Sequence, residues 1–324
     1  MASIRDVAQR AGVSVGTVSR YLNGQQLKQS NMEKIAEAIQ SLDYQENIIA
    51  KGLKNNRSFS IGLLMNSISS RFGSEVVSGI EKVAEENGYS LLLSGFSSSA
   101  KKSDEKIEYL LKHAVDGLIV FLSGEEWTDI LKLTQVNVPI VCLNSPDIAA
   151  VADVLLLDDR QSVQKVIEHY ISIGHKKIGY IAAPQSDYTA RERLLGAENA
   201  IVESQVELEI IVGDYTRKSG YYGAKQLLDW GATAIFVSNY NMSIGALSCF
   251  NQEGLVIGKD ISFGHYDYLS EEDQSLLPQV TINPPAEKMG EKAAQLLLDR
   301  IKKTDITEVA KKQIIVMENK VLGF

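Results

Sequence analysis

The 324-residue sequence has little of what marks disulfide-stabilised, membrane or metal-binding proteins. It holds only two cysteines, Cys142 and Cys249, which are far apart, lie in apolar segments and lack metal-site spacing. No run approaches the roughly 20 apolar residues that a membrane helix needs, and the N-terminus lacks an apolar export segment. We therefore expect two buried thiols and a cytoplasmic protein with no membrane partner.

Common enzyme signatures are also missing. Neither a P-loop nor G-x-G-x-x-G stands between an expected strand and an expected helix, and the four histidines lack metal spacing. His175 lies in a turn before a strand, where we expect a structural role. The sequence thus predicts no enzyme, no cofactor and no metal site, although the parallel sheets expected below leave a nucleotide-using enzyme as the alternative.

The chain is acidic overall, but its N-terminal end carries a net positive charge. The net charge is −8, yet residues 1–60 carry eight basic and five acidic side chains, which leaves −11 for the rest. Because binding to a polyanion requires a cationic surface, this asymmetry favours a small basic head on an acidic body. A nucleic-acid partner therefore stays possible.

The N-terminal 46 residues have the pattern of three short helices. Apolar residues recur at helical spacing over 4–11, Gly12 ends that helix, and Ser14 can cap a second helix over 15–22. The S-x-x-E pattern of Ser30–Glu33 predicts a capping box for a third helix, with one apolar face made by Ile35, Ala36, Ile39 and Leu42. This arrangement predicts a helix-turn-helix domain whose second helix can enter the major groove, and a plain helical cap is the alternative.

The letters G-x-S-x-G at Gly12–Gly16 have a second interpretation. On a strand-to-helix elbow they would make Ser14 a hydrolase nucleophile. Such an elbow needs a buried strand before the serine, but here a helical pattern precedes it. We therefore expect Ser14 to cap a helix and not to act as a nucleophile.

Residues 47–60 predict a very short helix and a linker. A helix of about two turns with Gly52 inside is marginal alone in water. Its exposed Ile and Leu side chains, flanked by Lys51, Lys54 and Arg57, suit an apolar wedge in a DNA minor groove. An ordinary interdomain linker is the alternative.

Residues 61–324 alternate strand-like apolar runs with amphipathic helical ones, such as those at 75–86, 104–113 and between 121 and 139. Runs buried on both faces predict parallel sheets, and two such series indicate two Rossmann-like subdomains. Ligands of these sheets bind beyond the carboxyl ends of the strands. The expected strands are IGLLM, YSLLLS, GLIVF and PIVCL, then DVLLL, KIGYIAA, EIIVGD, TAIFVS and ISFGHYD.

The stretches IRDVAQRAGVSVGTVSRYLNG and NIIAKGLKNNRSFSIGLL resemble the head and hinge of the LacI/GalR family of bacterial transcriptional repressors. The resemblance implies that Val15, Gly16 and Arg20 occupy base-reading positions and that Leu53 is the intercalating hinge leucine. Since Val15 and Gly16 offer few hydrogen bonds to bases, we expect Arg20 to read guanine. Residues 42–47 lack the usual glycine and proline before the hinge. Side chains near the DNA backbone or neighbouring bases would be Ser14, Thr17, Ser19 and Asn23.

In the body the resemblance implies a periplasmic-binding-protein fold with an effector site between subdomains. ARERLLGAENA places Arg193 on the effector-binding arginine, whose fork can hold hydroxyls, a carboxylate or a phosphate, with a structural ion pair as the alternative. SNYNMSIGAL keeps the family asparagine as Asn239. ISFGHYDY leaves either Tyr266 or Asp267 at the position of the strand-end aspartate. Further effector-site candidates follow the strands: Phe72, Asn144, Asp187, Thr189 and Tyr215.

Together these patterns predict a helix-turn-helix domain at 1–46, a hinge at 47–60 and an effector-binding and dimerisation domain at 61–324. The chain is expected to cross between the two subdomains near 158, 284 and 310. The expected function is a DNA-binding transcriptional regulator, acting as a repressor, that pairs as a homodimer on operator DNA. A small polar effector, by resemblance a sugar or sugar phosphate, would control it allosterically.

Overall fold

The computed structural model describes residues 2–22, 24–45, 57–65, 70–95, 100–121, 136–267, 280–303 and 311–323. The chain divides into two compact units, Met1–Phe59 and Ser60–Phe324. The helix expected between 121 and 139, the hinge helix at 47–53 and the candidates Asn23 and Leu53 lie outside the described residues.

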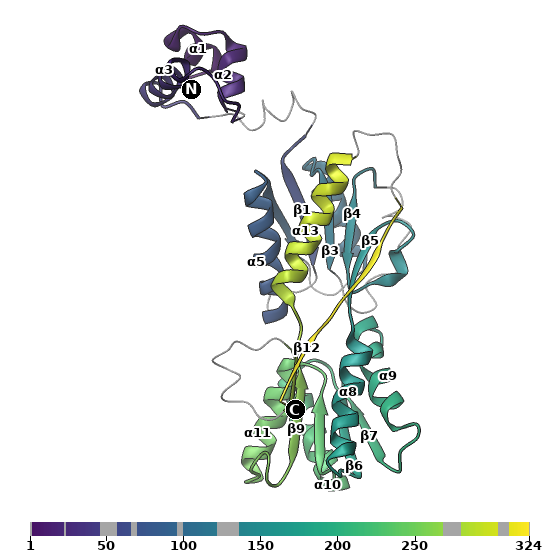
Figure 1. Cartoon of the computed structure of the whole chain (residues 1–324). Helices are drawn as coiled ribbons and strands as arrows, with labels where there is room; N and C mark the ends of the chain where they lie inside the picture. The colour runs from purple at the N-terminus through teal and green to yellow at the C-terminus, as the bar shows by residue number, and fades with distance from the viewer. Residues whose placement is uncertain are drawn as a thin grey trace. The chain divides into compact units, whose positions relative to one another are not determined.

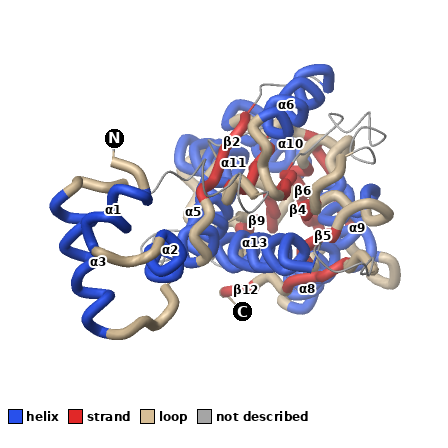
Figure 2. Tube along the Cα trace, turned by 90° about the horizontal axis from the view of Figure 1, so that it is seen from above, coloured by secondary structure: helices blue, strands red, loops and turns tan. Residues whose placement is uncertain are grey.

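The described part of the first unit contains the helices α1 (Ile4–Ala11), α2 (Val15–Leu22) and α3 (Gln29–Ser41), which Figure 2 labels. Gly12 ends α1 with a positive φ of 66°, as its position in the sequence predicts. The core of this unit is small and apolar, which fits three short helices that are not stable alone. It is made by Val7, Ala8, Ala11, Val18, Ile35 and Ala38.

Two details of these helices differ from the prediction. A capping box does form, but at α1, where Ser3 and Asp6 bond each other's backbone N–H groups. At α3 the helix begins one residue before Ser30, so Glu33 instead accepts from the side chain of Gln29. Ala38 is buried in place of Ala36, which is exposed, because only the former follows Ile35 by three residues.

The second unit holds two sheets (Figure 1). Among the described residues, the first sheet has six parallel strands in the order β11-β5-β4-β3-β1-β2. Helix α6 (Ala100–Lys112) packs on one face, and α13 (Ala286–Lys303) packs on the other face beside α5 (Arg71–Glu86). The strands are β1 (Ser60–Met65), β2 (Ser90–Gly95), β3 (Gly117–Phe121), β4 (Ile140–Leu143), β5 (Asp153–Leu157) and β11 (Ile314–Met317).

The second sheet has the described strand order β12-β10-β9-β8-β6-β7, in which only β12 is antiparallel to its neighbour. Helices α8 (Asp159–Ser172) and α9 (Tyr188–Ile201) cover one face, and α10 (Arg217–Trp230) and α11 (Tyr240–Gln252) cover the other. The strands are β6 (Lys177–Ala182), β7 (Glu207–Val212), β8 (Ala234–Val237), β9 (Ser262–Tyr266), β10 (Val280–Asn283) and β12 (Lys320–Leu322).

The chain passes between the two sheets at three described places. It leaves the first sheet after β5, returns after β10 through α13, and leaves again between β11 and β12. Figure 1 shows this last extended segment running from one sheet to the other. The last passage lies at 318–319 and not near 310, because residues 314–317 pair with β5 in the first sheet. Residues next to these passages are placed to link the two halves.

Candidate functional site

The turn before α2 is built by Ser14. Its hydroxyl oxygen accepts the backbone N–H of Thr17 at 3.1 Å and lies 2.8 Å from the Thr17 hydroxyl. Ser14 therefore caps α2 as the sequence predicts. Because helix α1, and no strand, precedes it, the geometry of a nucleophile elbow is not met.

Helix α2 buries Val18, and most of the described residues predicted to contact DNA are exposed. Val15 is 42% exposed, and Ser14, Gly16 and Arg20 are exposed as well. Thr17 and Ser19 are partly buried. The Arg20 side chain folds back along the helix, where its Nε lies 3.4 Å from the Gly16 carbonyl oxygen. One face of α2 thus carries small side chains and a single guanidinium, which suits close approach to a groove.

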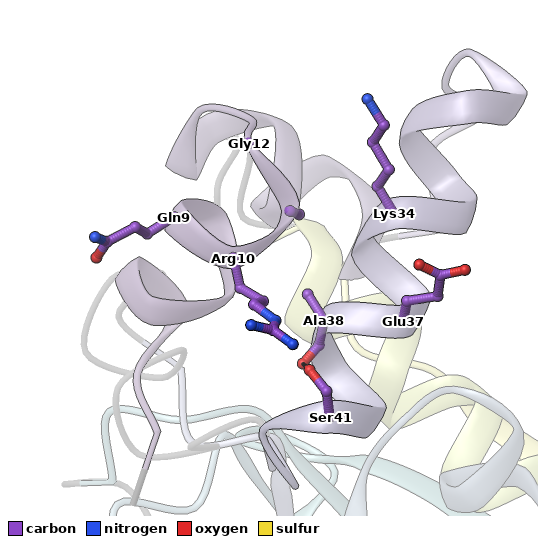
Figure 3. A pocket seen from close by; sticks show the side chains of 8 residues that line it. Gln9, Arg10, Gly12, Lys34, Glu37, Ala38 and Ser41 are labelled. Carbon is purple, nitrogen blue, oxygen red and sulfur yellow. Dashed lines mark hydrogen bonds between the residues drawn. The ribbon is translucent and has the colours of Figure 1, made fainter.

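A separate hollow of roughly 520 Å³ lies between α1 and α3, as Figure 3 shows. Basic and acidic side chains both line it, and none of its residues comes from α2. The lining residues are Gln9, Arg10, Ala11, Gly12, Lys34, Glu37, Ala38 and Ser41. The hollow is therefore distinct from the exposed face of α2.

In the second unit, Arg193 of α9 is held at the end of the second sheet. Its Nη1 donates to the carbonyl of Ser238, just after β8, at 2.9 Å, and its Nε lies 3.4 Å from Oδ1 of Asp159. The guanidinium carbon lies 3.4 Å from the ring centroid of Tyr266, a cation–π contact. Burial lowers the pKa of Arg193, but the surrounding groups, of which Asp159 is the strongest, together outweigh burial and raise it, so the side chain is cationic.

Tyr266 and Asp267, the alternatives at the end of β9, point to different partners. The Tyr266 ring is 2% exposed, and its hydroxyl donates to Asp159 and lies 3.0 Å from Oδ1 of Asn319. Asp267 instead accepts the backbone N–H of Tyr240, at the start of α11, at 3.3 Å. The Tyr266 ring therefore packs against the Arg193 guanidinium, whereas Asp267 lies beside the segment that follows β8.

Three further candidates form one hydrogen-bonded group after β6 and β7. One oxygen of Asp187 accepts the N–H and the hydroxyl of Thr189, both at 3.1 Å, and the other accepts the hydroxyl of Tyr215 at 2.7 Å. Burial and the Asp187 charge raise the pKa of Tyr215, so its phenol stays protonated as the donor. The electrostatic influence of Asp187 also reaches Arg193 and raises its pKa. Arg193 and this group therefore share one electrostatic environment.

The remaining candidates, Asn239, Phe72 and Asn144, have no described contact to Arg193. Asn239 caps α11 by accepting the N–H groups of Asn241 and Met242. Phe72, at the start of α5, packs edge-on against Phe121 at the end of β3. Asn144, after β4, has a positive φ of 59° and a buried side-chain oxygen without a described partner.

The sequence reasoning missed Asp159, Ser238 and Asn319. Asp159 is 2% exposed and follows β5, so the strand-end rule could have found it. Asn319 also ties the passage between β11 and β12 to Asp158, whose Oδ1 accepts the Asn319 N–H at 2.7 Å. Asp159 and Asn319 connect the Arg193 group to two of the passages between the sheets.

Other sequence predictions concern isolated residues. Cys142 and Cys249 are free and buried, as expected. The ring of His175 bridges the hydroxyls of Thr233 and Ser262, each at 2.8 Å, which is the structural role predicted for it.

The described residues contain no cluster of three or more histidine, cysteine or acidic residues fit for a metal. None of the described helices has the length and apolar character to cross a membrane.

Comparisons with known proteins agree with this architecture. The model of bacterial regulatory proteins of the lacI family matches residues 3–47, and that of periplasmic binding proteins and the sugar binding domain of the LacI family matches residues 58–320. The HTH-type transcriptional repressor PurR of Actinobacillus pleuropneumoniae is 32% identical over 309 residues, covering 93% of this chain and 92% of the relative. The ribose operon repressor of Haemophilus influenzae is 29% identical over 308 residues, with the same two coverages of 93% and 92%.

A solved structure shares the fold over nearly the whole chain. The lac repressor dimer bound to operator and the anti-inducer ONPF superposes with a TM-score of 0.83 at 26% identity, covering 99% of this chain and 97% of that one. The resemblance deduced from residues 4–24 and 47–64 is thereby confirmed. Since family models match both units and a repressor with 32% identity spans almost all of the sequence, the chain belongs to the LacI family of bacterial regulatory proteins.

Proposed function

We propose that the chain is a transcriptional repressor that binds operator DNA through α2 and responds to a small polar effector held around Arg193. One observation carries the proposal. A separate unit, whose described part has three helices and an exposed, capped α2, is joined to a two-sheet body in which a partly buried arginine lies at the strand ends. The relatives named above are repressors, and one was solved as a dimer on its operator.

The exposed face of α2 supplies the DNA contacts. Val15 would touch a thymine methyl group, Gly16 would let the backbone approach closely, and Arg20 would donate two hydrogen bonds to guanine. Leu53 would enter the minor groove from the hinge. The contacts to phosphates and neighbouring bases would come from Ser14, Thr17, Ser19 and Asn23.

The effector site is proposed at the strand ends of the body. Arg193 would donate to the ligand, and Tyr266 would orient Arg193 without contacting the ligand. The effector class expected for the family is a sugar or sugar phosphate. The other contacts would come from Phe72, Asn144, Asp187, Thr189, Tyr215, Asn239 and Asp267.

Two chains would pair so that their heads meet a two-fold symmetric operator. An effector that binds one arrangement of the two body halves more tightly would change DNA affinity by linkage. The protein would thus act by binding and not by catalysis, and it would work in the cytoplasm, where bacterial DNA lies.

The test separates the two units. The full chain and a chain lacking residues 1–59 are compared for binding to a labelled duplex from the region upstream of its own gene, and both are screened against sugars and sugar phosphates by thermal shift. We expect the deletion to abolish duplex binding and to leave ligand stabilisation intact. Duplex binding that survives the deletion would contradict the role given to α2.

A further inference from the structure

The effector site proposed above contains a guanidinium that is already paired. Asp159 is 2% exposed and lies 3.4 Å from Nε of Arg193. Arginine stays protonated in proteins, and a carboxylate this close to a fixed cation is favoured in its ionised form. Burial is the strongest influence on Asp159 and raises its pKa overall, although Arg193 and the Tyr266 hydroxyl act against that rise. The contact of 3.4 Å with a permanently charged guanidinium is the reason for assigning Asp159 as a carboxylate, which makes the Arg193–Asp159 pair neutral as a unit.

The described side chains around this pair add negative charge. Asp187 is 6% exposed and influences Arg193 electrostatically, and Asp267 lies at the end of the same strand as Tyr266. The nearby cations on α9 and α8 are engaged elsewhere. Arg191 donates to the carbonyls of Gln185 and Ser186, and Arg160 pairs with Glu192 at 2.8 Å.

Arg193 still has hydrogen-bonding capacity for a ligand. Nε faces Asp159, Nη1 donates to Ser238, and no described residue accepts from Nη2. A hydroxyl oxygen can accept from Nη2 without disturbing the pair with Asp159. A phosphate or carboxylate would approach Asp159 and Asp187 as well, and repulsion between like charges is strong where water is excluded.

We infer that the effector is uncharged and hydroxyl-rich, such as a neutral sugar or polyol, and is neither a phosphate ester nor a carboxylic acid. Asp159 is the residue that sets this specificity, because its charge cancels that of Arg193. The inference rests on the proposed function, since it concerns the effector site at Arg193, and it narrows the ligand class expected there.

The experiment measures the thermal stability of the full chain with inorganic phosphate, glucose 6-phosphate and glucose at constant ionic strength. The variants are Asp159→Asn, Arg193→Ala and the double variant, and the matched control is Asp158→Asn, alone and combined with Arg193→Ala. The control removes one charge from the adjacent residue, whose Oδ1 bonds Ser162 and the N–H of Asn319. Subtracting the response of the corresponding Arg193→Ala protein isolates stabilisation that depends on Arg193 from general salt effects.

We expect neither phosphate compound to stabilise the wild type through Arg193. In Asp159→Asn the charge of the Arg193 guanidinium is no longer balanced by a carboxylate, so it should bind phosphate. The Tm should then rise by about 3–6 °C when phosphate is present at ten times its dissociation constant. The Asp158→Asn control should respond like the wild type.

An Arg193-dependent rise with phosphate or glucose 6-phosphate in the wild type would overturn the inference, and so would an Asp159→Asn protein that gains none. Both outcomes leave the proposed function standing, because DNA binding by the same preparations is measured separately, and loss of that binding would count against the proposed function alone. If Asp159→Asn does not fold, the wild type decides. Arg193-dependent binding of either phosphate compound refutes the inference, and rejection of both supports it.

Discussion

Replacing Tyr266 by phenylalanine tests the support of the effector site. The substitution keeps the ring against which the Arg193 guanidinium lies 3.4 Å from the centroid. It removes the hydroxyl that donates to Asp159 and lies 3.0 Å from Asn319. Asp159 is buried, so water cannot replace the lost donor without cost.

The magnitude follows from the kind of hydrogen bond that is lost. A buried hydrogen bond to a charged group contributes about 1.5–3 kcal/mol. For a unit of this size that corresponds to a fall in Tm of roughly 3–12 °C. Thermal denaturation of the intact chain, followed by near-UV circular dichroism, measures the transition of the body.

Tyr170→Phe is the matched control. Tyr170 is 1% exposed and belongs to the same core cluster, but its hydroxyl has no hydrogen-bond partner among the described residues. Removing an unpaired buried hydroxyl should leave the Tm unchanged or raise it. Equal losses of Tm in the two variants would refute the argument that the Tyr266 hydroxyl stabilises Asp159.

Three further predictions concern the two units. Ser14→Ala removes the acceptor for the Thr17 N–H and should destabilise α2 by about 1 kcal/mol, with weaker duplex binding by fluorescence anisotropy, whereas Ser14→Thr should retain it. Gly245→Ala places a methyl group on the backbone carbonyl of Arg217, where α10 meets α11, and should cost about 1–3 kcal/mol by urea denaturation. His265 is fully buried, and burial lowers its pKa from 6.5 to about 4. The unfolded chain therefore binds a proton that the folded chain excludes, so Tm should fall as the pH drops from 6.5 toward 4, and His265→Phe should lessen that fall.

Local chemistry explains which features of the fold were predictable. The end of α1 at Gly12, the Ser14 cap and the apolar strands all depend on residues within one turn or one strand. The prediction of a capping box at Ser30–Glu33 was wrong because the helix begins one residue earlier, at Gln29. The periodicity of apolar residues does not resolve a shift of one residue at a helix end. The position of the last passage, between β11 and β12, was not predictable because it depends on the pairing of β11 with β5, which is distant in sequence.

The candidate site was predictable only in part for the same reason. The rule that ligands bind at strand ends, together with the family motifs, led to Arg193, Asp187 and Tyr215. It could not show that Arg193 is paired with Asp159 or that Tyr266 reaches Asn319, which is 53 residues away in sequence. Which side chains meet across a sheet depends on the packing of α8, α9 and the C-terminal strands, and no local pattern encodes that packing.

The most direct test of the account is the DNA affinity of the full chain with and without its effector, in the wild type and in Arg193→Ala. The wild-type affinity should change by about 5- to 150-fold on effector binding. Arg193→Ala should bind DNA like the effector-free wild type and should no longer respond. An Arg193→Ala protein whose DNA affinity still shifts with effector as in the wild type would contradict the account.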